Sequence, residues 1–259
     1  SLEQRAQVIE FSHRAVAGLV IVLIGSLAVW AFLRYRDQPR VLWPSVTAFG
    51  LVLFQAILGA IVVKLELEAL SVVLHLATAL SLLALLIYLD VGLYGRVAVD
   101  APAIRRRARV AAGSVFVLLL VGSYVSGSNA GYVFSDWPLM NGKVIPDLQV
   151  EPQAIHFLHR ALAAVVGVIL FAAITKIVRS TDRPAVARLA QTAGALFLVE
   201  ILVGAANVWT HLNAAFVTLH LAVGASIWAC LVGIAFLASP VAERAADPAM
   251  SRAPLPEAS

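Results

Sequence analysis

Four histidines stand at two matched positions in the two halves of this 259-residue chain. His13 opens a His-Arg-Ala triplet that recurs at His159, 146 residues later. His75 lies in a Leu-His-Leu-Ala segment that recurs around His220, 145 residues later. Two imidazoles are what six-coordinate haem needs, one on each face of the porphyrin. The duplicated histidine pairs therefore predict two metal–porphyrin sites.

Other interpretations of these histidines stay open at the level of the sequence. A histidine inside a membrane segment needs a reason, and a hydrogen-bonded packing role is a common one. Zinc is less favoured, because it requires three or four converging ligands. Each half offers two, with His156 and His211 as scattered extras that receive no role.

The two halves differ one helical turn before the first histidine of each pair. Glu10 precedes His13 by three residues, whereas His156 occupies the matching place before His159. Residues i and i+3 share a face of a helix, so Glu10 is expected to point toward the same ligand as His13. A carboxylate there can accept a proton, stabilise charge or act as a nucleophile. The plain alternative is an acid that begins a helix.

Two further features lie beside these positions. Arg14 and Arg160 follow their histidines and are expected either to pair with haem propionates or to anchor the helix ends at the water boundary. The segment Ser128–Gln153 combines turn formers with large apolar residues, among them Trp137. We expect this segment to form an outer loop that closes over the second site.

The elements that hold these residues are predicted to be membrane-spanning helices. The chain is 61% hydrophobic and 13% charged, with a mean hydropathy of +0.90, whereas soluble domains carry roughly 25% charged residues. Its apolar runs lack the alternation of a β-barrel and approach the ~20 residues that a spanning helix needs. Seven such segments are predicted: Phe11–Leu33, Leu42–Val63, Leu70–Tyr94, Val110–Gly127, Ala154–Val178, Ala187–Trp209 and Ala214–Ala238.

The basic residues predict the orientation in the membrane. Of the 19 Lys and Arg residues, fourteen fall on one side of the seven segments and five on the other. The positive-inside rule places the larger set in the cytoplasm. We therefore expect a multi-pass protein of the inner (plasma) membrane with a cytoplasmic C-terminus and histidine sites near the outer face. This topology explains the net charge of +4 without nucleic acid as a partner.

The repeat predicts the overall architecture. The segment Gln55–Gly59 is echoed by Glu200–Gly204 at the same offset of 145 residues. The second half has a span and a loop before His159 whose first-half counterparts would precede Ser1. We expect an all-α integral membrane protein of two pseudo-symmetric four-helix bundles, with seven spans present and the first span missing. The predicted parts are a half-bundle (1–95), a basic cytoplasmic linker (96–109), a four-helix bundle (110–238) and a disordered tail (239–259).

The duplicated set resembles the haem A synthase family over residues from about 1 to 238. The resemblance rests on Glu10-Phe11-Ser12-His13-Arg14, His75, His159-Arg160 and His220, with an Asp-Trp-Pro-Leu loop before the second His-Arg helix. The family oxidises a methyl group of haem O to a formyl group by successive hydroxylations, giving haem A. Many relatives carry a cysteine pair in a first outer loop that this sequence does not contain.

The resemblance implies roles for individual residues. His13 and His75, with Arg14, would hold the substrate haem O, and Glu10 would be the catalytic residue. His159 and His220, with Arg160, would hold a permanent haem b that delivers electrons. Membrane lipid surrounds the protein, a haem O synthase and the assembly of a terminal oxidase are the implied partners, and oligomerisation stays open.

Two other classes of function compete with this interpretation. A di-haem cytochrome of the b type that only transfers electrons would hold two permanent haems and give Glu10 no role. A haem transporter or chaperone would release its haem unchanged. The difference between Glu10 and His156 favours an enzyme over both.

Overall fold

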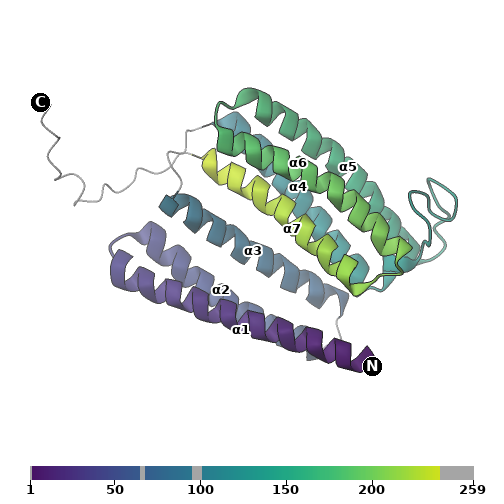
Figure 1. Ribbon diagram of the computed structural model, residues 1–259, viewed down its shortest axis with the longest axis horizontal. Helices are drawn as coiled ribbons and strands as arrows, with labels where there is room; N and C mark the ends of the chain where they lie inside the picture. The colour runs from purple at the N-terminus through teal and green to yellow at the C-terminus, as the bar shows by residue number, and fades with distance from the viewer. Residues whose placement is uncertain (1, 65–67, 95–100, 240–259) are drawn as a thin grey trace, which may run out of the picture.

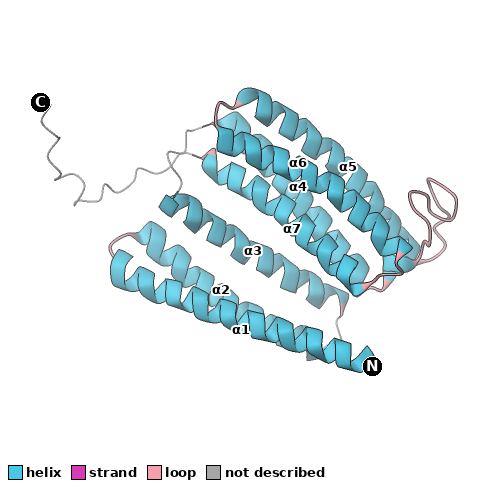
Figure 2. Ribbon diagram, viewed as in Figure 1, coloured by secondary structure: helices cyan, strands magenta, loops and turns pink. Residues whose placement is uncertain are grey.

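The computed structural model describes residues 2–64, 68–94 and 101–239, and within them it is helical. Figure 2 shows helices joined by loops, and no β-strand occurs among these residues. The elements are α1 (Leu2–Tyr35), α2 (Pro39–Lys64), α3 (Ala69–Tyr94), α4 (Pro102–Gly127), the short 3-10 helix η1 (Ala130–Tyr132), α5 (Glu151–Ser180), α6 (Pro184–Trp209) and α7 (Ala214–Leu237).

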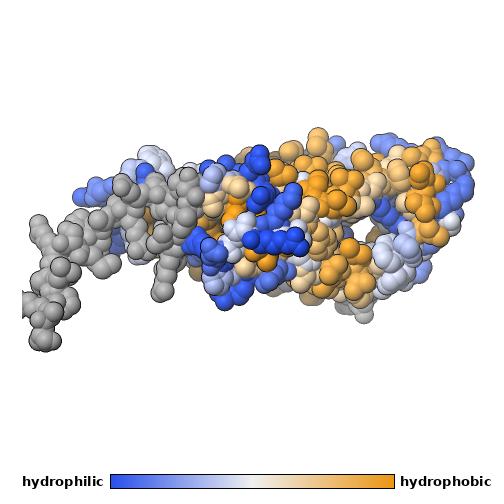
Figure 3. All heavy atoms as spheres, turned by 90° about the horizontal axis from the view of Figure 1, so that it is seen from above, coloured by the Kyte–Doolittle hydropathy of each residue, from blue (hydrophilic) through white to orange (hydrophobic). Residues whose placement is uncertain are grey.

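All seven α-helices are long and apolar enough to cross a membrane. In Figure 3 apolar residues fill the middle of the visible face, and hydrophilic residues gather toward its ends. Many large apolar side chains, such as Val168 and Leu33, point outward and are well exposed in the isolated chain. An outward apolar surface suits contact with lipid. The predicted all-α multi-pass membrane protein is confirmed.

Proline sets the start of three helices. Pro39, Pro102 and Pro184 are the first residues of α2, α4 and α6, where a missing N–H costs nothing. Helix α4 begins eight residues before the apolar segment predicted at Val110. The basic stretch 105–109, expected in a linker, therefore lies on a helix, because long arginine side chains let a helix extend past the apolar region. Residue 95 of the predicted half-bundle, residues 96–100 of that linker and residues 240–259 of the predicted tail lie outside the described residues.

The helices form two groups (Figure 1). Helices α4 to α7 make a closed bundle in which α4 packs on α5, α5 on α6, α6 on α7 and α7 on α4. Helices α5 and α7 thus occupy opposite corners of this bundle. In the other group α1 packs on α2 and α2 on α3, and α3 also contacts α4 and α7.

The larger buried core lies in the α4–α7 bundle. It contains Leu170, Ile227 and Leu231 together with fully buried alanines such as Ala111 and Ala190. Small residues let membrane helices approach closely, where packing replaces the hydrophobic effect. The core of the α1–α3 group is smaller and consists of Ile24, Ala48, Val52 and Leu82. The α4–α7 bundle is therefore more tightly packed than the α1–α3 group.

The helix boundaries follow the offset seen in the sequence. Helix α6 begins and ends 145 residues after α2, and α7 begins 145 residues after α3. The repeated histidines are carried by α1, α3, α5 and α7. These four helices begin at the same end of the molecule, and the loop between α4 and α5 lies at that end too (Figure 1). The pseudo-symmetry of two four-helix bundles stays a prediction.

Candidate functional site

His159 and His220 face each other across the α4–α7 bundle. Their helices stand at opposite corners, and the centroids of their rings lie 6.4 Å apart at an interplanar angle of 84°. An imidazole nitrogen binds a transition metal at about 2 Å, so two rings on opposite sides of one iron have centroids roughly 6 Å apart. The two side chains are therefore spaced as axial ligands of one haem would be.

Several histidine nitrogens are buried without an aligned hydrogen bond. They are the Nδ1 atoms of His75, His156, His159 and His220, of which that of His220 lies 3.2 Å from Oε1 of Glu200. Buried polar atoms are usually hydrogen-bonded, so these nitrogens do not have the pairing expected of four packing histidines. Across the described residues, no three His, Cys, Asp or Glu side chains converge as a zinc site requires. The donor set fits bis-histidine haem better than either alternative.

Glycines make room for three of the imidazoles. A Cβ atom at Gly122 of α4 would lie 3.0 Å from Cε1 of His159, and one at Gly204 of α6 would lie 3.2 Å from Cε1 of His220. In the first half, a Cβ atom at Gly59 of α2 would lie 3.3 Å from Cε1 of His75. These distances are tighter than ordinary contacts, so a side chain would displace each ring. Gly59 and Gly204 occupy equivalent places in the repeated segment, which links that part of the repeat to the histidines.

The first-half histidines lie in a more open setting. His13 on α1 is exposed and His75 on α3 is half-buried, and the two are close enough to interact electrostatically. The carbonyl of His75 accepts a hydrogen bond from Nε2 of Gln55 at 2.8 Å. The hydroxyl of Thr78 donates to Oε1 of Gln55, so the amide of Gln55 is fully engaged away from the imidazole ring.

Glu10 forms an ion pair on the surface of α1. Its Oε1 atom lies 3.2 Å from Nη1 of Arg14, one turn later, and both side chains are exposed in the isolated chain. Glu10, His13 and Arg14 thus lie within five consecutive residues of α1, and all three are exposed. The placement agrees with the predicted shared face of Glu10 and His13, whose roles the structure alone does not test.

At the matching place in the second half, His156 and Arg160 hold the outer loop. His156 is buried against the ring of Phe134, and its Nε2 atom accepts a hydrogen bond from Nε of Arg160 at 3.0 Å. Nη1 of Arg160 donates to the carbonyls of Asp136 and Leu139 at 3.1 and 2.9 Å. His156, to which the sequence assigned no role, therefore helps Arg160 to attach the loop to α5.

The loop is also tied down within itself and to α6. The carboxylate of Asp136 accepts hydrogen bonds from the backbone N–H groups of Asn141 and Gly142 at 2.7 and 2.8 Å. These bonds, first that of Gly142, hold the pKa of Asp136 below its ordinary value, and the guanidinium of Arg160 lowers it further. Trp137 meets Trp209 at the end of α6, edge to face, with ring centroids 5.7 Å apart.

His211 receives a structural placement. It lies in the turn between α6 and α7 with a φ of 56°, and its ring is 5.0 Å from that of Tyr132 in η1. It does not join the pair formed by His159 and His220. The sequence left its role open, and the structure places it in the contact between the turn and the outer loop.

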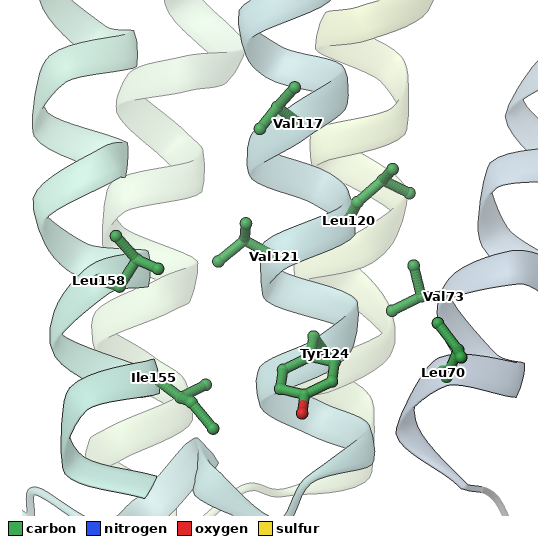
Figure 4. Close-up of a pocket in the computed structure, with 8 residues that line it drawn as sticks. All are labelled: Leu70, Val73, Val117, Leu120, Val121, Tyr124, Ile155 and Leu158. Carbon is green, nitrogen blue, oxygen red and sulfur yellow. The ribbon is translucent and has the colours of Figure 1, made fainter. Parts of the chain in front are cut away.

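An apolar hollow of about 340 Å³ lies between α3, α4 and α5 (Figure 4). It is lined by Leu70, Val73, Val117, Leu120, Val121, Tyr124, Ile155 and Leu158. None of the four repeated histidines contributes to it, and its lining offers no charged group. We therefore assign it to contact with lipid rather than to the chemistry of the site.

Glu200 is a residue near the second site to which the sequence gave no role. Its Oε1 atom lies 3.2 Å from Nδ1 of His220, and its side chain is 15% exposed. The sequence contained a signal, because Glu200 occupies the place of Gln55 in the repeat. The contact itself depends on how α6 faces α7 and could not be derived from spacing.

Comparisons with known proteins identify the family of this chain. The model of a family described as cytochrome oxidase assembly protein matches residues 1–232. The chain is 31% identical over 233 residues to a haem A synthase of Caulobacter vibrioides, covering 81% of this chain and 66% of that protein. This chain belongs to the haem A synthase family.

Two further haem A synthases show how far the likeness extends. The protein of Shouchella clausii is 32% identical over 177 residues, which cover 63% of this chain and 56% of that relative. The protein of Symbiobacterium thermophilum is 28% identical over 247 residues, which cover 91% of this chain and 80% of that relative. The chain thus spans less than two thirds of the length of the Shouchella and Caulobacter haem A synthases.

Proposed function

We propose that this chain oxidises the methyl group of haem O to the formyl group of haem A by successive hydroxylations. The observation that carries the proposal is the asymmetry between two otherwise matched histidine pairs. Only the first pair has a carboxylate, that of Glu10, one turn before its first histidine; the second has His156 there, buried and engaged with Arg160. The names of the relatives, haem A synthases, support the same reaction.

The second half would hold the resident cofactor. His159 and His220, with the spacing given above, would ligate haem b, which supplies electron transfer when bound. Nη2 of Arg160 is buried without a hydrogen-bond partner, so it is free to pair with a propionate while Nη1 holds the loop.

The first half would hold the substrate. His13 and His75 would bind haem O, with Arg14 at the outer end of α1 as the partner of a propionate. Glu10 would act at the methyl carbon of the substrate, as a proton acceptor or as the group that stabilises a cationic centre.

The proposal extends to the setting of the protein. A haem O synthase would supply the substrate, and the assembly of a terminal oxidase would consume the product. The distribution of basic residues favours the inner (plasma) membrane with the C-terminus in the cytoplasm and the haem sites near the outer face. Two four-helix bundles related by the repeat would each hold one haem.

The test is a haem inventory of the purified protein after expression with a supply of haem O. Haems are extracted, separated by chromatography and identified by mass. We expect haem b together with haem O, hydroxylated intermediates or haem A. Glu10→Gln should retain haem O and lose nearly all haem A, whereas Glu68→Gln, a matched exposed acid just before α3, should leave the inventory unchanged.

A di-haem cytochrome is the second candidate, favoured by the ligand spacing already present between His159 and His220. It predicts two haem b groups per chain and no effect of Glu10→Gln on their identity. That result in the same inventory would replace the synthase with an electron carrier.

A further inference from the structure

Glu200 is an acid within the span of α6, in the more closed half of the protein. Its Oε1 atom lies 3.2 Å from Nδ1 of His220 on α7. Both Nδ1 of His220 and Oε2 of Glu200 are buried without an aligned hydrogen-bond partner. A carboxylate inside a membrane segment is costly and is usually kept for a functional partner. The imidazole of His220 is in position to be the functional partner of this carboxylate.

The equivalent residue of the first half behaves differently. Gln55, 145 residues earlier, donates to the carbonyl of His75 and accepts from the hydroxyl of Thr78. The place of Thr78 is taken in the second half by Val223, which has no hydroxyl group. Glu200 therefore lacks the partner that holds Gln55, and its carboxylate lies beside the imidazole ring instead.

The space for the carboxylate depends on a glycine. A Cβ atom at Gly224 of α7 would lie 2.9 Å from Oε1 of Glu200 and 2.8 Å from Cδ2 of Leu119. Both distances are too short for a real contact, so a side chain at this position would force the carboxylate aside. The first half has Ala79 at the equivalent position. Glu200, Val223 and Gly224 thus differ together from Gln55, Thr78 and Ala79.

We infer that Glu200 is a positioning residue that receives the Nδ1–H of His220, so that Nε2 is the nitrogen presented to a haem iron in the second half. A carboxylate behind a ligating imidazole fixes its tautomer and orientation and makes it a stronger donor. A stronger donor favours ferric over ferrous iron, so the second-half haem becomes the better reductant of the two. This inference rests on the proposed function only in requiring haem at the second site.

The test compares haem b bound to the wild-type chain, Glu200→Gln and Glu151→Gln. Glu151→Gln removes the same charge from the exposed start of α5 without a contact to His220. A redox titration followed by absorbance gives the ferrous-to-ferric ratio at the wild-type midpoint. Loss of a hydrogen-bond partner behind a metal ligand typically lowers metal affinity or activity by roughly 10- to 100-fold. Taking the lower end of that range for the weaker donor, we expect Glu200→Gln to raise the ferrous-to-ferric ratio about tenfold and to alter the low-spin ferric EPR spectrum. Glu151→Gln should change neither.

A second variant guards against loss of folding in the first. Gly224→Ala leaves the carboxylate in the chain but displaces it from His220, and it should shift the ratio in the same direction as Glu200→Gln. Wild-type potential and spectrum in both variants would overturn the inference. A potential that depends on Glu200 in a chain that makes no haem A would refute the proposed function alone. A wild-type chain that binds no haem b would refute both.

Discussion

The α1–α3 and α4–α7 groups carry the same histidines in different surroundings. In the α4–α7 bundle, the rings of His159 and His220 are half-buried and lie 6.4 Å apart beside the larger buried core. In the α1–α3 group, His13 is exposed and the buried core is small. The same repeated histidines thus stand among four mutually packed helices in one group and on α1 and α3 of a three-helix group in the other.

The residues one turn before the histidines extend this comparison. His156 and Arg160 form a hydrogen-bonded pair that reaches the outer loop, whereas Glu10 and Arg14 form an exposed ion pair on α1. The same i to i+4 spacing thus fastens a loop in one half and presents a carboxylate in the other. The His156–Arg160 pair attaches the loop to α5, and the Glu10–Arg14 pair keeps its charged groups at the surface.

Removal of a ligand histidine should break the comparison most strongly. His220→Ala leaves one axial ligand in the closed bundle, and we expect haem b retention there to fall by more than the roughly 10- to 100-fold that loss of an outer partner costs a metal site. His211→Ala, in the turn just before α7, provides the matched control and should retain haem. The measurement is the absorbance of bound haem per chain after gel filtration. Equal retention in the two variants would contradict the ligand assignment.

Added methyl groups should separate the glycines that cradle imidazoles from those that do not. In Gly122→Ala the new Cβ lies 3.0 Å from Cε1 of His159, whereas Gly113 of the same helix has nothing within 4 Å. Overpacking costs about 1–3 kcal/mol, so Gly122→Ala should weaken haem b binding roughly tenfold. Gly113→Ala should bind haem b like the wild type, as judged by haem titration. Weak binding in both variants would indicate a general effect on α4.

Arginine-to-lysine changes should show that the two His-Arg pairs do different work. Arg160→Lys loses the fork that contacts the carbonyls of Asp136 and Leu139. Hydrogen bonds from charged groups contribute about 1.5–3 kcal/mol, so we expect roughly tenfold or faster hydrogen exchange in loop segment 136–143. Arg14 contacts Glu10 and not the loop, so Arg14→Lys should leave hydrogen exchange in loop segment 136–143 unchanged. Unchanged exchange in both would remove Arg160 as the loop's anchor.

The sequence was sufficient for the spans, and the ligand roles of the histidines stay predictions. Apolar runs of the right length predict helices in a membrane, because every backbone group must be paired there. The offsets of 145 and 146 residues select His75 and His220 on one hand and His13 and His159 on the other. The start of α4 was predicted less well, at Val110 instead of Pro102. Hydropathy scores arginine as polar and does not account for the apolar part of its side chain, which can pack along a helix.

The contacts between helices could not be derived in the same way. The approach of Glu200 to His220 and the place of Gly122 against His159 depend on how each helix is rotated about its axis. The repeat contained a hint, the exchange of Gln55 for Glu200, but a pattern does not show toward which neighbour a side chain turns. Arg160 likewise uses Nη1 to bind the loop, while its Nη2 atom has no hydrogen-bond partner. The sequence does not distinguish these two nitrogens.

The smallest expected effect is the loosening of the loop between α4 and α5 at low pH. Asp136 accepts the N–H groups of Asn141 and Gly142, whose φ angles of 54° and 74° aim both groups at the carboxylate. The pKa of Asp136 lies below its ordinary value of 3.8, so its stabilising effect is complete above that value and is lost as the pH falls through the lowered pKa. Pepsin cleavage within loop segment 136–143 should therefore increase toward low pH in the wild type. In Asp136→Asn the loop should be cleaved readily at every acidic pH, because the charge that holds the two N–H groups is gone. A loop equally resistant in both proteins would assign its order to Arg160 alone.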